Sequence, residues 1–369
     1  MPEERISWKE SNLALIGSDL DHKIKQAAAG GEHAWDAIGA EPGVKVWRIE
    51  QFKVVAWPEK DYGSFYTGDS YIVLYAYKIE DKLYRDLYIW IGSESSQDEY
   101  GTAAYKMVEA DDFLGGSPVQ HREVQGHESS KFKKIFGTLT YWQGGVESGF
   151  HHVEPTEEVP NLFRIKGTTA HMSLTQVSVS KSSLSKGDSF ILKASSSKVW
   201  LWHGENANPD ERARAASLAE KMCSEGTVKT LDQGSNDDDP DFWAYLGEGE
   251  IAEEGEEDED VEEFAPLLFK LPGGADDEPI QVGKGERVKI GFSSGSKLPK
   301  DLLNDADVFL LDAGWEVFLW IGKDADKSEK LGAFAKADKY LQGDARTVDL
   351  PLTIVKSGYE SSDFDTYFH

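Results

Sequence analysis

The sequence has few of the features that would mark a secreted or membrane protein. Among 369 residues there is one cysteine, Cys223, so no disulfide can form within the chain. Cys223 falls in a helical pattern, which predicts a small buried side chain rather than a nucleophile. No apolar run approaches the roughly 20 residues of a membrane span, and the N-terminal MPEERISWKES is charged, unlike a signal peptide. We therefore expect a soluble, cytoplasmic protein.

Basic residues are scarce relative to acidic ones. The chain has 39 Lys and Arg against 67 Asp and Glu, a net charge of −28. This charge opposes nonspecific attraction to nucleic acid or to anionic lipid, and we predict no nucleic-acid partner. Divalent cations remain candidates, because sites built from carboxylate and carbonyl oxygens suit calcium.

One pattern occurs three times. WIGSESSQDE begins at Trp90, WHGENANPDE at Trp202 and WIGKDADKSE at Trp320, so that a Gly follows each Trp by two residues and a Glu by nine. Upstream lie TGDSYIVLY, KGDSFILKA and DADVFLLDA, whose aspartates Asp69, Asp188 and Asp307 are spaced 119 residues apart. Constant spacing of this kind indicates a triplicated domain.

Each copy predicts a hairpin followed by a helix. The short apolar runs after each Asp, and LYIWIG, KVWLWHG and WEVFLWIG after them, are rich in β-branched and aromatic residues and read as paired strands. Small and apolar residues at three- and four-residue intervals then predict an amphipathic helix, with Gly226 and Gly343 as C-caps in copies two and three. The fold class is α+β: three tandem domains, each a central mixed sheet sandwiched between a long and a short helix.

These repeats divide the chain into five parts. We expect an N-terminal helical extension (1–39), segment one (40–150), segment two (155–247), an acidic linker (248–263) and segment three (264–369). The linker has eleven acidic residues and no basic one, which predicts an extended, disordered tether.

The repeated Glu and Asp permit two interpretations. Glu99, Glu211 and Glu329 follow Ser96, Asn208 and Asp326 by three residues, as in a capping box, and Gly-Asp before a strand is ordinary turn chemistry. Local chemistry thus explains each residue without a ligand. It does not explain why Asp and Glu occur together in all three copies. If the hairpin and the helix start lie side by side, two carboxylates converge and a cation between them would be bound.

The long ordered motifs FYTGDSYIVLY, WIGSESSQDEYGTAAYKMVEADDFLGG, VQHREVQGHESSKF and GGVESGFHHVEP resemble the gelsolin family, and the similarity covers essentially the whole chain. Three segments resemble its severin and fragmin type. The resemblance implies an actin-binding protein that is activated by calcium, severs filaments and caps their barbed ends. A protein of this type would bind the actin monomer and the filament and would be a monomer when free.

The resemblance also implies ligands for a calcium ion in each segment. Segment one would use the Gly68 carbonyl, Asp69, Glu99 and the Val146 carbonyl. Segment two offers the Gly187 carbonyl, Asp188 and Glu211, with a last ligand expected from the acidic linker. Segment three offers Ala306 in place of the usual Gly, with Asp307 and Glu329.

A further calcium ion would be shared with actin, and its ligands in this chain would be Asp111, Gly116 and Pro118. The helix from Gln97 to Leu114 would then enter a cleft of actin. The side chains expected toward actin are Phe52, Tyr105, Val108, Asp112 and Phe113. Val108 could equally face its own sheet.

Basic residues that members of the family use on filament sides are only partly retained. Arg164 and Lys166 are present, Arg212 and Arg214 lie on the second helix, and Thr168 and Thr169 stand where arginines are usual. Phosphoinositide regulation is therefore not supported.

Three other functional classes compete with severing and capping. The weakened basic cluster permits a calcium-dependent capping protein that does not sever. A purely structural calcium protein is another alternative. An enzyme is disfavoured, because neither His151, His152 nor Cys223 belongs to a nucleophile elbow, a zinc motif or a phosphate loop.

Overall fold

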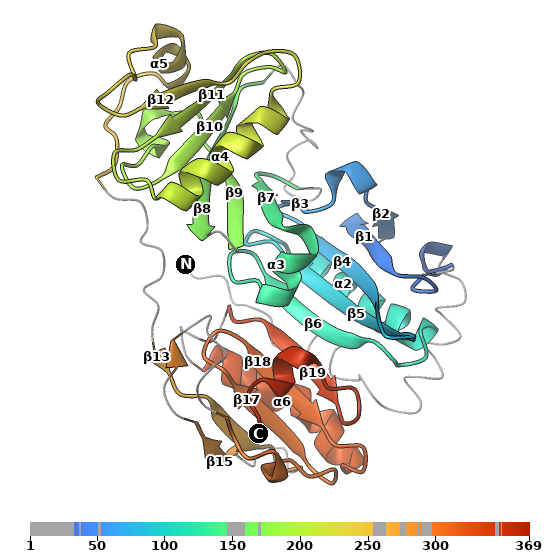
Figure 1. The fold of residues 1–369 in the computed structure, drawn as a ribbon. Coiled ribbons are helices and arrows are strands. Elements are labelled where there is room, and N and C mark those ends of the chain that lie inside the picture. Colours follow the sequence, from blue (N-terminus) through green and yellow to red (C-terminus); the bar gives the residue numbers. More distant parts are fainter. Residues whose placement is uncertain are drawn as a thin grey trace. The chain divides into compact units, whose positions relative to one another are not determined.

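The computed structural model describes residues 33–36, 38–50, 53–145, 159–168, 171–253, 263–273, 278–285, 288–289, 297–343, 347 and 349–369 (Figure 1). The predicted helix in the N-terminal extension lies outside these residues. The chain divides into two compact units. Unit one comprises Met1–Lys60, Asp69–Ser129 and Val261–His369, and unit two comprises Asp61–Gly68 and Ser130–Asp260.

Unit one is built on a ten-stranded sheet. Its strands lie in the order β15 (Ile280–Lys284), β14 (Leu267–Lys270), β17 (Val308–Asp312), β18 (Val317–Ile321), β19 (Leu352–Lys356), β6 (Val119–Val124), β5 (Lys82–Ile91), β4 (Ser70–Ile79), β1 (Gly43–Glu50) and β2 (Lys53–Ala56). The predicted hairpins β4/β5 and β17/β18 are antiparallel, and β6 and β19 run parallel to β5 and β18. Strands β13 (Glu263–Phe264) and β16 (Val288–Lys289) form a separate pair.

The ten-stranded sheet joins segments one and three edge to edge. Strand β19 pairs antiparallel with β6, with Thr353 opposite His121. Side chains reinforce the join, since His121 Nδ1 lies 2.9 Å from Thr353 Oγ1 and Arg122 Nη1 donates to the Leu350 carbonyl at 3.2 Å. Each strand thereby covers an edge that would otherwise expose unpaired backbone groups.

Two long helices cover the sheet of unit one. Helix α2 (Gln97–Phe113) packs on β5, β4 and β1, and α6 (Lys327–Gln342) packs on β17 and β18. The apolar face of α2 contributes Ala103, Ala104, Met107 and Ala110 to a core that includes Trp35 and Trp47. Helix α7 (Ser362–Asp365) and the 3-10 turns η3 (His33–Trp35), η4 (Glu59–Asp61) and η6 (Lys300–Leu302) are short.

Unit two is built on a seven-stranded sheet. The order is β12 (Lys229–Asp232), β11 (Val199–His203), β10 (Ser189–Lys193), β8 (Asn161–Thr168), β9 (His171–Val177), β7 (Thr138–Trp142) and β3 (Ser64–Tyr66). Helix α4 (Pro209–Met222) packs on β10, β11 and β8, while α3 (Ser130–Phe136), α5 (Pro240–Leu246) and η5 (Lys181–Ser183) complete the unit. Strands β3 and β7 precede segment two in the chain, yet they extend its sheet, because β7 pairs with β9. No helix in the described residues is long and apolar enough to cross a membrane.

The glycine after each repeated Trp makes the same contact in all three copies. Gly92, Gly204 and Gly322 each donate a backbone hydrogen bond of 3.0 Å to the carbonyl of Asp69, Asp188 and Asp307. A Cβ on Gly204 would lie 2.2 Å from the Lys186 carbonyl oxygen, and one on Gly322 would lie 2.3 Å from that of Asp305. The repeated Gly therefore lets the end of the second strand approach the turn that carries the Asp.

Two expectations from the sequence are wrong. Helix α4 ends at Met222 with Cys223 as C-cap, so Gly226 does not cap it. A Cβ on Gly226 would instead lie 2.3 Å from the Ser197 carbonyl oxygen, so close packing requires the glycine. Cys223 itself is only half-buried.

The acidic linker is not wholly a free tether. Ile251 packs against the core of unit two, Ala252 forms a bridge to Ser185, and Glu253 pairs with Lys186 at 2.8 Å. Apolar burial and a local cation outweigh charge repulsion over these residues. Residues 254–262 of the linker lie outside the described residues.

The glycine contact predicts an asymmetry between two substitutions. Gly204→Ala should lower the free energy of unfolding by about 2 kcal/mol or more, because its methyl group meets a backbone carbonyl. Gly101→Ala is the control, since a Cβ at Gly101 within α2 meets nothing within 4 Å, and removing a helical glycine should stabilise by about 1 kcal/mol. Thermal unfolding followed by circular dichroism measures both. Equal midpoints for Gly204→Ala and the parent protein would contradict the packing argument.

Candidate functional site

The repeated Asp and Glu occupy the same two positions in each copy. Each Asp immediately precedes the first hairpin strand, which begins at Ser70, Ser189 or Val308. Each Glu lies in the first turn of the long helix that follows. A hairpin start and a helix N-terminus therefore recur together three times.

In segment one, hydrogen bonds connect the two positions. Ser70 Oγ lies 2.8 Å from Ser95 Oγ, and Ser95 Oγ donates to Glu99 Oε2 at 3.4 Å. The predicted capping box is present, since Ser96 Oγ accepts from the Glu99 amide at 3.3 Å and Glu99 Oε2 accepts from the Ser96 amide at 3.4 Å. Asp69 is fully buried and Glu99 is 2% exposed. Glu99 therefore caps the helix while its carboxylate lies beside the strand that Asp69 precedes.

Segment two repeats the arrangement with a different cap. Asn208 Oδ1 accepts from the Glu211 amide at 2.8 Å, and Pro209 is the first helical residue. Asp188 and Glu211 are both buried. The start of the linker passes the turn next to Gly187, because the Lys186 amide donates to the Ala252 carbonyl at 3.0 Å. The linker thus passes next to the turn that carries Gly187 and Asp188.

In segment three, the side chain of Asn304 contacts both the turn before Asp307 and the Asp307 carboxylate. Asn304 Oδ1 accepts from the Ala306 amide at 2.9 Å, and Asn304 Nδ2 donates to Asp307 Oδ2 at 2.5 Å. Burial raises the pKa of Asp307, but Lys270 and Asn304 outweigh burial and hold that pKa below its ordinary value. Glu329 Oε2 is buried and has no hydrogen-bond partner among the described residues.

Two predicted site residues are outside the described residues: Val146, a predicted calcium ligand, and Phe52, which was predicted to face actin. The boundary between the two units falls between Gly68 and Asp69. Across the described residues, no group of three or more His, Cys, Asp or Glu side chains is placed to hold a metal. A site of the predicted kind needs only two carboxylates in each segment, with carbonyls supplying the other oxygens.

The end of α2 carries the residues predicted to face actin. Asp111, Asp112 and Val108 are buried, Tyr105 is half-buried, and Phe113 is 43% exposed. Gly115 and Gly116 then turn the chain with φ of +74° and +69° before Ser117 and Pro118. The burial of Val108 agrees with the alternative that it faces its own domain.

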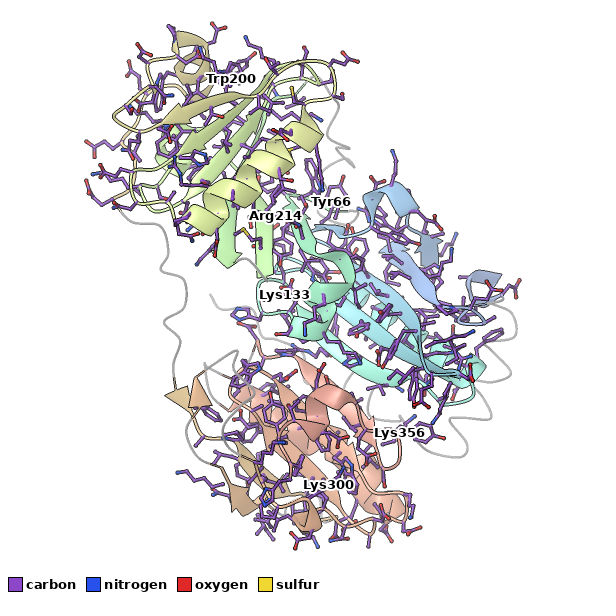
Figure 2. All side chains as sticks on the ribbon, in the orientation of Figure 1. Tyr66, Lys133, Trp200, Arg214, Lys300 and Lys356 are labelled. Carbon is purple, nitrogen blue, oxygen red and sulfur yellow. The ribbon has the colours of Figure 1, made fainter. Side chains whose placement is uncertain are left out.

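A lysine of segment three reaches this turn. Lys356 Nζ donates to the Gly116 carbonyl at 2.7 Å and lies 3.9 Å from Asp111 Oδ2. Lys356 ends β19, which pairs with β6 next to α2, and it is labelled in Figure 2. Its ammonium therefore contacts two of the three groups predicted to bind the calcium ion shared with actin.

The basic residues predicted for the filament side make internal contacts. Arg164 Nε lies 2.9 Å from Asp188 Oδ2, Arg212 pairs with Asp232, and Arg214 donates to Thr138 Oγ1. Lys166 is half-buried. Thr169 lies outside the described residues, and Thr168 ends β8.

Three cations were missed by reasoning from the sequence: Arg48, Lys270 and Lys356. Arg48 Nη2 lies 2.6 Å from Asp69 Oδ2, and Lys270 Nζ lies 2.7 Å from Asp307 Oδ2. A sequence signal existed for two of them. An aromatic residue, a basic residue and an aliphatic residue follow one another in WRI (47–49), FRI (163–165) and FKL (269–271). Lys356 has no such signal, because its contact depends on pairing between distant segments.

Comparison with known proteins agrees with this repeated architecture. The gelsolin repeat model matches three times, at residues 51–133, 172–267 and 295–364. Gelsolin-like protein 2 of Lumbricus terrestris is 38% identical over 92% of this chain and 90% of its own length. Severin of Echinococcus granulosus is 36% identical over 94% of this chain and 93% of its own. Actin depolymerising venom protein gelsolin 1 of Platymeris rhadamanthus is 35% identical, with 89% of each chain covered.

These matches reach well over half of the residues and nearly the full length of several relatives. The α+β class predicted from the sequence is confirmed. The structure adds that segments one and three share one sheet and that β3 and β7 extend the sheet of segment two. With three successive gelsolin repeats, the chain belongs to the gelsolin family.

Proposed function

We propose that this chain is a calcium-activated actin-binding protein that severs filaments and caps their barbed ends. It acts by binding rather than by catalysis, as a monomer on the cytoplasmic actin cytoskeleton. The observation that carries the proposal is the match, over 94% of this chain, to a relative named severin, together with the three gelsolin repeats of this chain. A relative named for actin depolymerisation matches over a similar length.

The donor atoms at the repeated positions fit calcium. Asp69 with Glu99, Asp188 with Glu211, and Asp307 with Glu329 supply only oxygen, which is what a hard cation prefers. Four of these six carboxylates are buried, and the Asp307 side chain is 14% exposed. Glu329 Oε2 is buried with no hydrogen-bond donor among the described residues. The carbonyls of Gly68, Val146, Gly187 and Ala306 would complete the sites. Bound calcium would supply the positive charge that lets two buried carboxylates remain ionised together.

On this proposal, the protein severs a filament by binding surfaces that adjacent actin subunits use to contact each other. Segment two would dock on the side of a filament through Lys166 and the arginines of α4. Segment one would then place the end of α2 between adjacent actin subunits, where exposed Phe113 enters an apolar pocket and Asp111 faces an ion shared with an actin carboxylate. The shared ion accounts for binding between two acidic proteins. Because the cleft is the one used by the next subunit, the protein then remains as a cap.

On this proposal, segment three holds segment one in place when no calcium is bound. Pairing of β19 with β6 fixes segment three beside α2, and Lys356 contacts Asp111 and the Gly116 carbonyl. Actin and its shared ion would need these same two groups. Segment three therefore covers part of the actin-binding surface until calcium loosens the pairing.

A capping protein that does not sever is the alternative. The internal pairing of Arg164 and Arg212 favours it, because both guanidinium groups already bind a carboxylate of the same segment. Filament fragmentation in calcium distinguishes the two: shortened filaments support severing, whereas blocked barbed-end growth without shortening supports capping alone. The threonines at 168 and 169 give phosphoinositide regulation no support.

Glu99→Gln separates capping of the helix from ligation of calcium. The amide keeps an oxygen that can accept the Ser96 hydrogen bond but loses the charge that calcium needs. We expect an unchanged unfolding midpoint in EGTA and weaker calcium binding by titration calorimetry. Unchanged calcium binding would leave the capping box as the full role of Glu99.

Phe113→Ala tests the actin-facing end of α2. It removes an exposed aromatic ring, so stability should hardly change while capping weakens by about tenfold or more, as for an interface anchor. Ile280→Ala is the control, because Ile280 is 54% exposed on β15, the edge strand of the same sheet that lies farthest from the strands under α2. Barbed-end elongation assays measure both variants. Equal loss in the two would argue against a specific role for Phe113.

Lys356→Met tests the cover over segment one. The variant keeps the aliphatic stem but loses the ammonium on Asp111 and Gly116, so severing should need less calcium. Lys300→Met is the control, since Lys300, labelled in Figure 2, pairs with Asp365 within segment three at 2.8 Å. Fragmentation is measured against free calcium for both. A calcium dependence that is unaltered by Lys356→Met would contradict the proposed role of this contact.

A further inference from the structure

Every aspartate at the three repeated positions carries a cation from the same place in its own repeat. Arg48 binds Asp69 at 2.6 Å, Arg164 binds Asp188 at 2.9 Å, and Lys270 binds Asp307 at 2.7 Å. In each contact one nitrogen of the cation meets a carboxylate oxygen of the Asp: Arg48 Nη2, Arg164 Nε and Lys270 Nζ.

The register of the sheets shows why the contact repeats. Arg48 on β1 lies opposite Tyr71, Arg164 on β8 opposite Phe190, and Lys270 on β14 opposite Phe309. Each of these partners is two residues after the Asp, so cation and Asp are diagonal neighbours across an antiparallel pair. Long side chains reach across such a diagonal. The contact is therefore built into the repeat and does not depend on how segments pack together.

Burial makes a countercharge necessary when no metal is bound. Asp69 is fully buried, Asp188 is 4% exposed, and Arg48 is 1% exposed. An ionised carboxylate in such a place costs several kcal/mol unless a positive charge or hydrogen bonds compensate it. Neighbours add hydrogen bonds to the same carboxylates: Tyr71 donates to Asp69 at 3.4 Å, Ser185 donates to Asp188, and Asn304 donates to Asp307 at 2.5 Å.

We propose that Arg48, Arg164 and Lys270 are internal substitutes for calcium, which compete with the ion for these aspartates and so set the calcium concentration at which each segment responds. This inference rests on the calcium sites of the proposed function. Two cations on one carboxylate repel each other, so calcium binding must weaken the ion pair. By reciprocity, the ion pair must weaken calcium binding by the same factor.

A purely structural role for the cations predicts the opposite. If each cation only fixes the orientation of its Asp, removing it leaves the carboxylate misplaced and calcium binding becomes weaker. A competitor and a positioning group therefore differ in the sign of the effect on affinity.

Lys270 is the best position for the test, because its side chain is 36% exposed and its replacement should not unfold segment three. Arg48 is less suitable, since loss of a fully buried cation would leave Asp69 uncompensated. Lys270→Met retains the length of the stem, and Lys270→Arg retains the charge. Lys339→Met is the matched control, because Lys339 pairs with Glu278 at 2.7 Å on the surface of the same segment and its loss changes the net charge equally.

Calcium chloride is titrated into each full-length variant by calorimetry, and thermal unfolding is followed in EGTA and in calcium. Lys270→Met should strengthen binding at one site by about fivefold or more, the lower range of coupling between linked sites. It should also widen the gap between the unfolding midpoints in calcium and in EGTA. Lys270→Arg and Lys339→Met should resemble the parent protein. Arg164→Gln should strengthen a second site in the same way.

Unchanged or weaker calcium binding by a folded Lys270→Met protein would overturn the inference. Equal strengthening by Lys339→Met would also overturn it, because net charge alone would then explain the result. Failure of the parent protein to bind calcium at all is a different outcome, which would overturn the calcium part of the proposed function as well.

Discussion

A buried carboxylate must be compensated, and this constraint organises the molecule. Asp69 and Asp188 precede the central hairpins of their segments, where their backbone carbonyls accept the hydrogen bond from the glycine after the repeated Trp. That contact fixes the carboxylate inside the domain, at the meeting point of strand and helix. The chain then supplies a cation from the neighbouring strand. In a protein with a net charge of −28, two of the basic residues therefore form ion pairs with buried aspartates.

A basic residue also contacts oxygen atoms of another segment. Lys356 lies on the turn after α2, and it comes from a strand whose pairing with β6 completes the ten-stranded sheet. Edge pairing satisfies backbone groups along β6 and β19, whereas Lys356 adds a contact that depends on charge. Shared sheet edges join the segments, and on our proposal the cations at oxygen-rich positions would make this joining sensitive to a competing ion.

The repeat itself was predictable because its signals are local. Hairpin strands alternate around short turns, the Trp-x-Gly spacing marks a strand end, and Ser96 with Glu99 forms the capping box that the residues indicate. Short-range periodicity and capping depend on neighbours in sequence. The joining of domains was not predictable on this basis. Nothing in RTVDLPLTI identifies β6 as its partner, since an edge strand can pair with many sequences, and the burial of Asp112 depends on contacts that its own helix does not determine.

Errors in the sequence reading have a common cause. Gly226 was assigned to a helix cap from its position, but the close approach of Ser197 is a tertiary contact. The linker was assigned to a free tether from its charge, but Ile251 and Ala252 provide apolar and backbone contacts that average composition conceals. The contacts of Arg48 and Lys270 were not predicted for the same reason, because they depend on pairing between strands that are distant in sequence.

The three ion pairs differ in their exposure to solvent, and this difference predicts which segment would release its internal cation most easily. Arg48 is fully buried, Arg164 is partly buried, and Lys270 is the most exposed of the three. Water can solvate a displaced ammonium more easily at an exposed position, so segment three should give up its internal cation at the lowest cost in free energy. Segment three also contributes β19 and Lys356 to the cover over α2. On our proposal, the segment whose aspartate calcium reaches most easily is therefore the one whose release would uncover the helix that faces actin.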